Sequence, residues 1–148
     1  METMVRCAQA EDVTKLVNFL EKANLGTDGV KEAVDYFLLL EDDAGNIQAT
    51  LGIEPHGPVG LLRSLAITSS ASEKELLLIF EQMLLLARDK QMESLYLATN
   101  KKGSVQFFEM MGFQKVKQEQ LHEKIFDSAH VQHILTVGNS LFMELKLD

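Results

Sequence analysis

The sequence feature that most constrains the fold is the junction between an apolar segment, Leu61 to Ile67, and the long amphipathic segment that follows it. A short apolar run bounded by turn residues predicts a buried strand, and apolar residues that recur at i, i+3 and i+4 predict a helix. A strand joined to a helix by a short turn is a building unit of α/β folds. The turn between the two segments, Thr68 to Ala71, contains no glycine.

The helix after this turn is expected to begin with a capping box, Ser-x-x-Glu, in which each side chain accepts from the other residue's backbone N–H. Ser72 with Glu75 has the required spacing. Ser70 with Glu73 has it too, so the sequence leaves the register open. In either register the chain's own side chains occupy a helix start that would otherwise bind anions, and they place carboxylates at the positive end of the helix dipole.

The other segments alternate between strand and helix patterns along the whole chain. Strands are predicted at Val5–Cys7, Tyr36–Leu40, Ile47–Glu54, Val59–Ile67, Ser94–Ala98, Phe113–Val116 and Ser140–Leu147. Helices are predicted at Glu11–Ala23, Val30–Val34, Ser72–Gln91 and Gly103–Met111, with a broken helical segment at Gln118–Ile134. Turn-forming residues predict turns at Asp42–Asn46 and Pro55–Pro58. This order predicts a single α/β domain over residues 1–148, with a mixed central β-sheet flanked by helices.

Charge and composition argue against several classes of protein. A net charge of −8 and a pI of about 5.0 argue against nucleic acid as a partner, because phosphate binding needs a basic patch. No apolar run reaches the roughly 18 residues that cross a bilayer, so no membrane partner is expected. Met1-Glu2-Thr3-Met4 is short and acidic, which predicts no signal peptide and a cytoplasmic location. The only cysteine, Cys7, is expected to be a buried, unreactive thiol within a strand.

Three segments resemble a known superfamily: Leu62–Ile67, Leu95–Asn100 and Phe107–Phe113. With the element order, they resemble the GNAT superfamily of acyl-CoA-dependent N-acyltransferases over nearly the whole chain. With Val-Arg-x-Ala at Val5 to Ala8, they are most similar to a branch of small GNAT proteins associated with arsenic resistance. The resemblance implies acetyl-CoA as the cofactor, held in a gap beside the strand Leu61 to Ile67.

In this resemblance, the backbone amides of that strand hold the acyl and pantetheine groups, and the following turn cradles the pyrophosphate. The cofactor-contacting positions that it implies are Leu65, Ala66, Ile67, Ser72, Lys74, Asn100 and Phe108. GNAT proteins carry Arg/Gln-x-x-Gly-x-Gly/Ala in the turn, whereas this chain has Ser72, Glu75 and Leu77 at the conserved places. A β-carbon there obstructs the approach of phosphate to the backbone. Many members also have a tyrosine, which protonates the departing thiolate, where this chain has Phe108.

Two residues are candidates for the chemistry. Glu54 matches the place where some GNAT proteins keep a general base that takes a proton from the substrate amine through water; the alternative is an exposed glutamate beside a turn. Arg63 would bind a substrate carboxylate or pair with an acidic residue, since an arginine in an apolar strand needs a partner. His56 is a candidate base or substrate contact; the alternative is a solvated turn histidine. No metal site is predicted, because His130 and His133 lack a cysteine or acidic partner.

The sequence leaves two main hypotheses for function, and a third possibility stays open: an altered acyl donor, or CoA bound without its pyrophosphate anchored by the turn. The first is a GNAT-type N-acetyltransferase that moves acetyl from acetyl-CoA to a small amine or amino-acid-like acceptor, with impaired or atypical CoA binding. The alternative is a non-catalytic GNAT-fold binding or regulatory protein that has lost acyl-CoA binding. A homodimer formed through the Leu-rich helix or the last strand also stays open.

Overall fold

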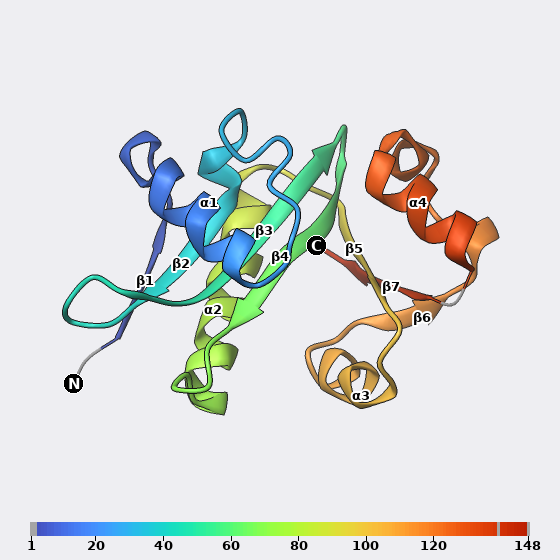
Figure 1. The fold of residues 1–148 in the computed structure, drawn as a ribbon. Helices are drawn as coiled ribbons and strands as arrows, with labels where there is room; N and C mark the ends of the chain where they lie inside the picture. The colour runs from blue at the N-terminus through green and yellow to red at the C-terminus, as the bar shows by residue number, and fades with distance from the viewer. Residues whose placement is uncertain (1–2, 139, 148) are drawn as a thin grey trace. The chain divides into compact units, whose positions relative to one another are not determined.

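A computed structural model describes residues 3–138 and 140–147 (Figure 1). Met1 and Glu2, on which the prediction of no signal peptide partly rests, lie outside the described residues. The strands are β1 (Met4–Cys7), β2 (Phe37–Glu41), β3 (Ile47–His56), β4 (Val59–Ile67), β5 (Ser94–Thr99), β6 (Gln114–Val116) and β7 (Leu141–Lys146). The α-helices are α1 (Val13–Lys22), α2 (Glu73–Asp89), α3 (Lys102–Met110) and α4 (Ala129–Val137). Short 3₁₀ helices are η1 (Ala10–Asp12), η2 (Val34–Tyr36), η3 (Gln118–Gln120) and η4 (Glu123–Asp127).

The described strands form one seven-stranded sheet in the order β1-β2-β3-β4-β5-β7-β6. β1 with β2, β2 with β3, β5 with β7 and β6 with β7 pair antiparallel, whereas β4 pairs with β5 in parallel. A parallel pair needs a crossover connection, which α2 supplies between β4 and β5. The predicted α/β architecture with a mixed sheet and flanking helices is therefore confirmed.

The chain forms two compact units, each of which is described here by itself. The first unit contains the residues up to Glu54 together with Arg63–Leu86, and the second contains Pro55–Leu62 and the residues from Ala87 onward. The first unit thus holds β1, β2, α1 and most of β3 and α2. The second holds β5, β6, β7, α3 and α4.

The core of the first unit forms where α1 packs on β2. Leu16 and Leu20, one helical turn apart on α1, are fully buried in one cluster with Phe37 and Leu39 of β2. Each such leucine contributes about 1.5–3 kcal/mol through burial of its side chain. The aromatic ring of Phe37 lies against Gly52 on the neighbouring strand, where an added β-carbon would come within 2.5 Å of the ring. Glycine is therefore required at position 52 by space.

An ion cluster joins β1, η1 and β2 in the same unit. The Arg6 guanidinium donates to both oxygens of the Asp12 carboxylate at 2.8 Å, and its Nε donates to Glu41 at 2.7 Å. Lys15 of α1 also donates to Glu41. The side chain of Asp12 is only 8% exposed, so this bidentate pair is largely shielded from water.

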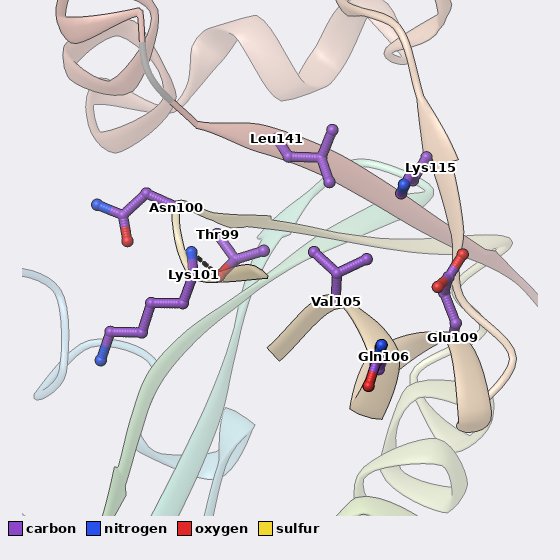
Figure 2. A pocket seen from close by; sticks show the side chains of 8 residues that line it. All are labelled: Thr99, Asn100, Lys101, Val105, Gln106, Glu109, Lys115 and Leu141. Carbon is purple, nitrogen blue, oxygen red and sulfur yellow. Dashed lines mark hydrogen bonds between the residues drawn. The ribbon is translucent and has the colours of Figure 1, made fainter. Parts of the chain in front are cut away.

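The second unit is built on β5, β7 and β6. Figures 1 and 2 show α3 and α4 on opposite sides of β7. On the α4 side, Val131 packs with Tyr96 of β5, Phe142 of β7 and Ile125 of η4 in one buried cluster. The first residues of β4 belong to this unit, since Val59 pairs with Ser94 of β5.

A predicted helix, a predicted turn and the predicted burial of Cys7 differ from the structure. Val30–Val34 was predicted as a helix, but residues 30–33 form turns and only the 3₁₀ helix η2 follows, because Gly29 adopts φ +78° and begins a turn. The second predicted turn is restricted to Gly57 and Pro58, since Pro55 and His56 continue β3. The prediction for Cys7 was wrong: the thiol is exposed, because β1 is at the edge of the sheet.

Candidate functional site

The start of α2 is closed by the capping box between Ser72 and Glu75. The Ser72 N–H donates to Oε1 of Glu75 at 2.8 Å, and the Glu75 N–H donates to Oγ of Ser72 at 3.1 Å. The predicted box is therefore confirmed, and its register is settled in favour of this pair. Hydrogen bonds from the Thr3 side chain and the Ser72 N–H lower the pKa of Glu75, so its carboxylate is charged at neutral pH.

The turn before α2 is fastened to β3 by Gln48. The amide oxygen of Gln48 accepts from the hydroxyls of Thr68, at 3.0 Å, and Ser70. The backbone of Thr68 donates to the Gln48 carbonyl at 2.9 Å. Ser70 is therefore a partner of β3 instead of the N-cap of α2. Sequence reasoning missed Gln48, because a polar residue in a strand carries no signal for a distant serine-rich turn.

Glu54 and Arg63, predicted separately, lie together in the first unit. Nη1 of Arg63 is 4.0 Å from Oε2 of Glu54, and the two side chains are 15% and 23% exposed. Both belong to neighbouring strands, Glu54 near the end of β3 and Arg63 within β4. The acidic partner expected for Arg63 is thus present. Its role toward a substrate carboxylate stays a prediction.

Arg63 has further partners, which fix its guanidinium group. Nη1 donates to the carbonyl of Asp28 at 2.8 Å, Nη2 approaches the carbonyl of Gly26 at 3.5 Å, and Nε donates to the Ser64 hydroxyl at 3.2 Å. The guanidinium carbon lies 5.4 Å from the centre of the Phe37 ring, within the range of a cation–π contact. Arg63 therefore fastens the segment after α1 to β4.

The predicted cofactor positions of the first unit lie along the end of β4 and the start of α2. Ala66 is 7% exposed, Leu65 is half-buried, and Ile67 is 43% exposed although it is apolar. Lys74 is exposed and lines an apolar hollow of about 390 Å³ with Leu77, Leu78 and other residues of the helix start. The backbone amides of Leu65, Ala66 and Ile67, which are expected to hold acyl and pantetheine groups, belong to this stretch.

The second unit has its own pocket at the end of β5 (Figure 2). The pocket has a volume of about 500 Å³. Asn100 is exposed at its rim, and Val105, Gln106 and Glu109 project from α3 with Lys115 and Leu141 across from them. The N-cap of α3 is Lys101, so Asn100 lies one residue before the cap.

Phe108 lies away from this pocket, in the core of the second unit. It is 7% exposed, and its ring packs edge-on against Phe107 and Phe113, with centroid separations of 5.6 and 5.9 Å. The structure therefore does not bring Phe108 and Asn100 together on the pocket wall. The contact of Phe108 with a cofactor stays a prediction.

Tyr96 forms a buried polar pair that sequence reasoning missed. Its hydroxyl donates to Glu144 at 2.9 Å, because the two residues face each other across β5 and β7. Burial, together with this hydrogen bond, raises the pKa of Tyr96 to about 12. The phenol is therefore neutral at physiological pH and pins β5 to β7.

The described residues lack two kinds of feature. No group of three or more His, Cys, Asp or Glu side chains in residues 3–138 and 140–147 is arranged to hold a metal ion. No helix in the same part of the chain has the length and apolarity needed to cross a membrane.

Solved structures of acetyltransferases share this fold. A Mycobacterium tuberculosis protein solved with CoA and NLQ has a TM-score of 0.77 at 20% identity, over 98% of this chain and 99% of that one. A GNAT acetyltransferase from Staphylococcus aureus Mu50 has a TM-score of 0.74 at 16% identity, over 99% of this chain and 100% of that one. The chain has the fold of the GNAT acetyltransferases.

A longer enzyme contains the same fold as one part. N-acetylglutamate synthase from Neisseria gonorrhoeae, solved with coenzyme A and N-acetyl-glutamate, gives a TM-score of 0.77 at 17% identity. The match covers 100% of this chain but 36% of the synthase, so the present chain spans about a third of that protein.

One curated relative is close enough in sequence to define a family. The uncharacterized protein YwlB of Bacillus subtilis (strain 168) is 36% identical over 127 residues, which cover 85% of each chain. The chain belongs to the same family as YwlB. No family model matches the sequence.

Proposed function

We propose that this protein is a GNAT-type N-acetyltransferase that moves an acetyl group from acetyl-CoA to a small amine or amino-acid-like acceptor. The proposal treats residues 1–148 as one GNAT-like domain. The observation that carries it is the likeness, over almost the whole of both chains, to a protein solved with CoA. The synthase solved with N-acetyl-glutamate supports an amino-acid-like acceptor. The likeness to the arsenic-resistance branch remains part of the proposal.

Glu54 and Arg63 supply the acid–base and orienting groups in this proposal. The Glu54 carboxylate takes a proton from the acceptor ammonium through water, and the free amine can then attack an acyl carbonyl. Arg63, 4.0 Å from Glu54, orients an acceptor carboxylate through hydrogen bonds from its guanidinium. Acetyl-CoA supplies the acyl group activated as a thioester. The backbone N–H groups of Leu65, Ala66 and Ile67 would hold its acyl and pantetheine parts, and Phe108, which has no hydroxyl, would supply no proton to the leaving group.

The start of α2 does not fit a pyrophosphate in the usual GNAT manner. The Ser72 side chain already accepts one first-turn N–H, and the charged Glu75 lies at the same end of the helix. A phosphate about 5 Å from this carboxylate would meet a repulsion of roughly 1–3 kcal/mol per charge pair. CoA binding is therefore atypical in this proposal, with the pyrophosphate held away from the helix start.

Calorimetric titration of acetyl-CoA into the wild type and Glu75→Gln tests this proposal. Glutamine keeps a capping box but removes the charge, so an unchanged affinity is expected when the pyrophosphate is held away from the helix start. A rise of roughly 5- to 100-fold would show instead that the phosphates approach it. Glu81→Gln is the matched control, because it removes the same charge about 9 Å further along the helix. Acetylation of a panel of amines and amino acids by the wild type then tests transfer itself.

The capping box favours a second candidate function, a non-catalytic GNAT-fold binding or regulatory protein. The box satisfies the N–H groups of Ser72 and Glu75 from within the chain, in a place where other helix starts offer them to an anion. No binding of millimolar acetyl-CoA by either the wild type or Glu75→Gln would refute the acetyltransferase and support this alternative. Binding followed by acetylation of one amine class would refute the alternative.

A further inference from the structure

β4 contains a backbone conformation that its sequence does not predict. Ser64 has φ +59°, in the left-handed region, in the middle of a strand. A residue with a β-carbon pays about 1–2 kcal/mol for this conformation, which glycine adopts freely. Contacts around Ser64 must therefore hold it there.

The left-handed residue coincides with one extra residue in β4. β3 and β4 are joined by the two-residue turn Gly57-Pro58, which makes His56 and Val59 the end pair. At the other end, Thr68 donates to the carbonyl of Gln48. Gln48 lies eight residues from His56 on β3, whereas its partner Thr68 lies nine residues from Val59. One additional residue on one strand is a β-bulge, which bends the strand and leaves a residue unpaired.

A buried threonine holds the bulge. Oγ1 of Thr50, which is fully buried on β3, donates to the Ser64 carbonyl at 2.7 Å. A side-chain donor thus satisfies a carbonyl in a place where the ladder is disrupted. Arg63 also holds Ser64, because its Nε donates to the Ser64 hydroxyl at 3.2 Å. The carbonyl of Ser64, a half-buried residue, would lose this side-chain donor if Thr50 were changed, which would favour a return to regular pairing.

We infer that Thr50 is a positioning residue for acyl-CoA: its hydroxyl locks Ser64 in the left-handed conformation and so directs the amides of Leu65, Ala66 and Ile67. The inference rests on the proposed function, because those amides are the groups assigned to the acyl and pantetheine parts. Thr50 itself is buried and touches no ligand in this scheme. Its effect reaches the site through the backbone of β4.

Three variants test the lock. Thr50→Val keeps the shape of the side chain and removes the hydroxyl, Thr50→Ser restores the hydroxyl, and Ser64→Gly in the Thr50→Val background removes the steric cost of positive φ. Thr50→Val is expected to bind acetyl-CoA about tenfold more weakly, which corresponds to about 1.4 kcal/mol. Thr50→Ser and the double variant are expected to recover most of the affinity. Ile53→Val, a buried change on the same strand, controls for loss of stability alone.

Amide hydrogen exchange gives a second measurement that does not depend on cofactor binding. The amides of residues 64–67 are expected to change exchange rate in Thr50→Val, return in Thr50→Ser and stay unchanged in Ile53→Val. Unchanged exchange, or equal loss of affinity in Thr50→Val and Ile53→Val, would overturn the inference. A wild type that fails to bind acetyl-CoA would sink the proposed function and the cofactor half of this inference, while the exchange data would still decide whether Thr50 locks Ser64.

Discussion

Replacing Asp12 by asparagine removes the charge that receives the bidentate hydrogen bonds of Arg6. Arg6 retains Glu41 as a partner, and asparagine can still accept from the Gln9 N–H, which donates to Asp12 at 2.8 Å. The substitution therefore removes the charge and one of the two oxygens to which Arg6 donates, because the amide nitrogen of asparagine cannot accept a hydrogen bond. It leaves the shape of the β1–η1 junction nearly unchanged.

The magnitude follows from the pKa of Asp12. The side-chain hydrogen bond from Arg6 is the largest cause that lowers this pKa from 3.8 to about 2, against the opposing effect of burial. At about 1.36 kcal/mol per pH unit, the difference amounts to about 2 kcal/mol of unfolding free energy at pH 7. The side chain is 8% exposed, so solvent screening reduces this value little.

The sign of the pH dependence is fixed by the direction of the shift. Because the folded-state pKa lies below the unfolded one, the stabilisation is fully present above about pH 5 and disappears as the pH falls through 3.8 toward 2. About half of it remains at pH 3. Urea denaturation of the wild type and Asp12→Asn at pH 7, 5, 4 and 3 measures the difference directly.

Glu11→Gln is the control, because it removes the same charge from the exposed neighbouring residue. We expect this variant to stay within about 0.5 kcal/mol of the wild type at every pH. A difference between the wild type and Asp12→Asn that is below 0.5 kcal/mol at pH 7, or that does not shrink toward pH 3, would refute the reasoning.

Three other substitutions have defined outcomes. Gly52→Ala would push a β-carbon to 2.5 Å from the buried Phe37 ring, and denaturant unfolding should show a loss of about 1–3 kcal/mol; an unchanged midpoint would contradict the packing. Ser72→Ala removes the cap of α2 and should lower stability by about 1 kcal/mol in thermal unfolding. An unchanged stability would mean that the capping box does not form in solution. Tyr96→Phe leaves Glu144 without its phenol donor and should remove the ultraviolet transition expected near pH 12. Since the folded pKa of Tyr96 is raised above 10, its stabilisation is present below pH 10 and is lost as the pH rises further, which alkaline unfolding of both proteins can verify.

The parts of the fold that could be predicted are those in which local chemistry and tertiary structure agree. Val59–Ile67 was placed with correct bounds, because its apolar run is closed by turn residues on both sides. The capping box of α2 could be predicted for the same reason, because the three-residue spacing of Ser72 and Glu75 is enough to bring the two together at a helix start. Glu54 and Arg63 were proposed one at a time; the turn between β3 and β4 joins their strands, but the contact between the two side chains was not foreseen.

The parts that could not be predicted depend on distant partners. A left-handed serine has no sequence signature, and Ser64 is held there by Thr50 from another strand. Burial of a cysteine depends on whether its strand is central or at an edge, which periodicity does not reveal. Gln48 and Glu144 belong to the same class, because each is defined by a partner more than fifteen residues away in sequence.

Cys7 is exposed on an edge strand, and the chain has no second cysteine. A disulfide between two cysteines of this chain therefore links two molecules. A preparation left to oxidise would contain covalent pairs, which size-exclusion chromatography would count as an oligomer unless a reductant is present. Under reducing conditions the same thiol is a unique handle for one fluorophore or spin label in the unit that carries Glu54 and Arg63, without an engineered cysteine.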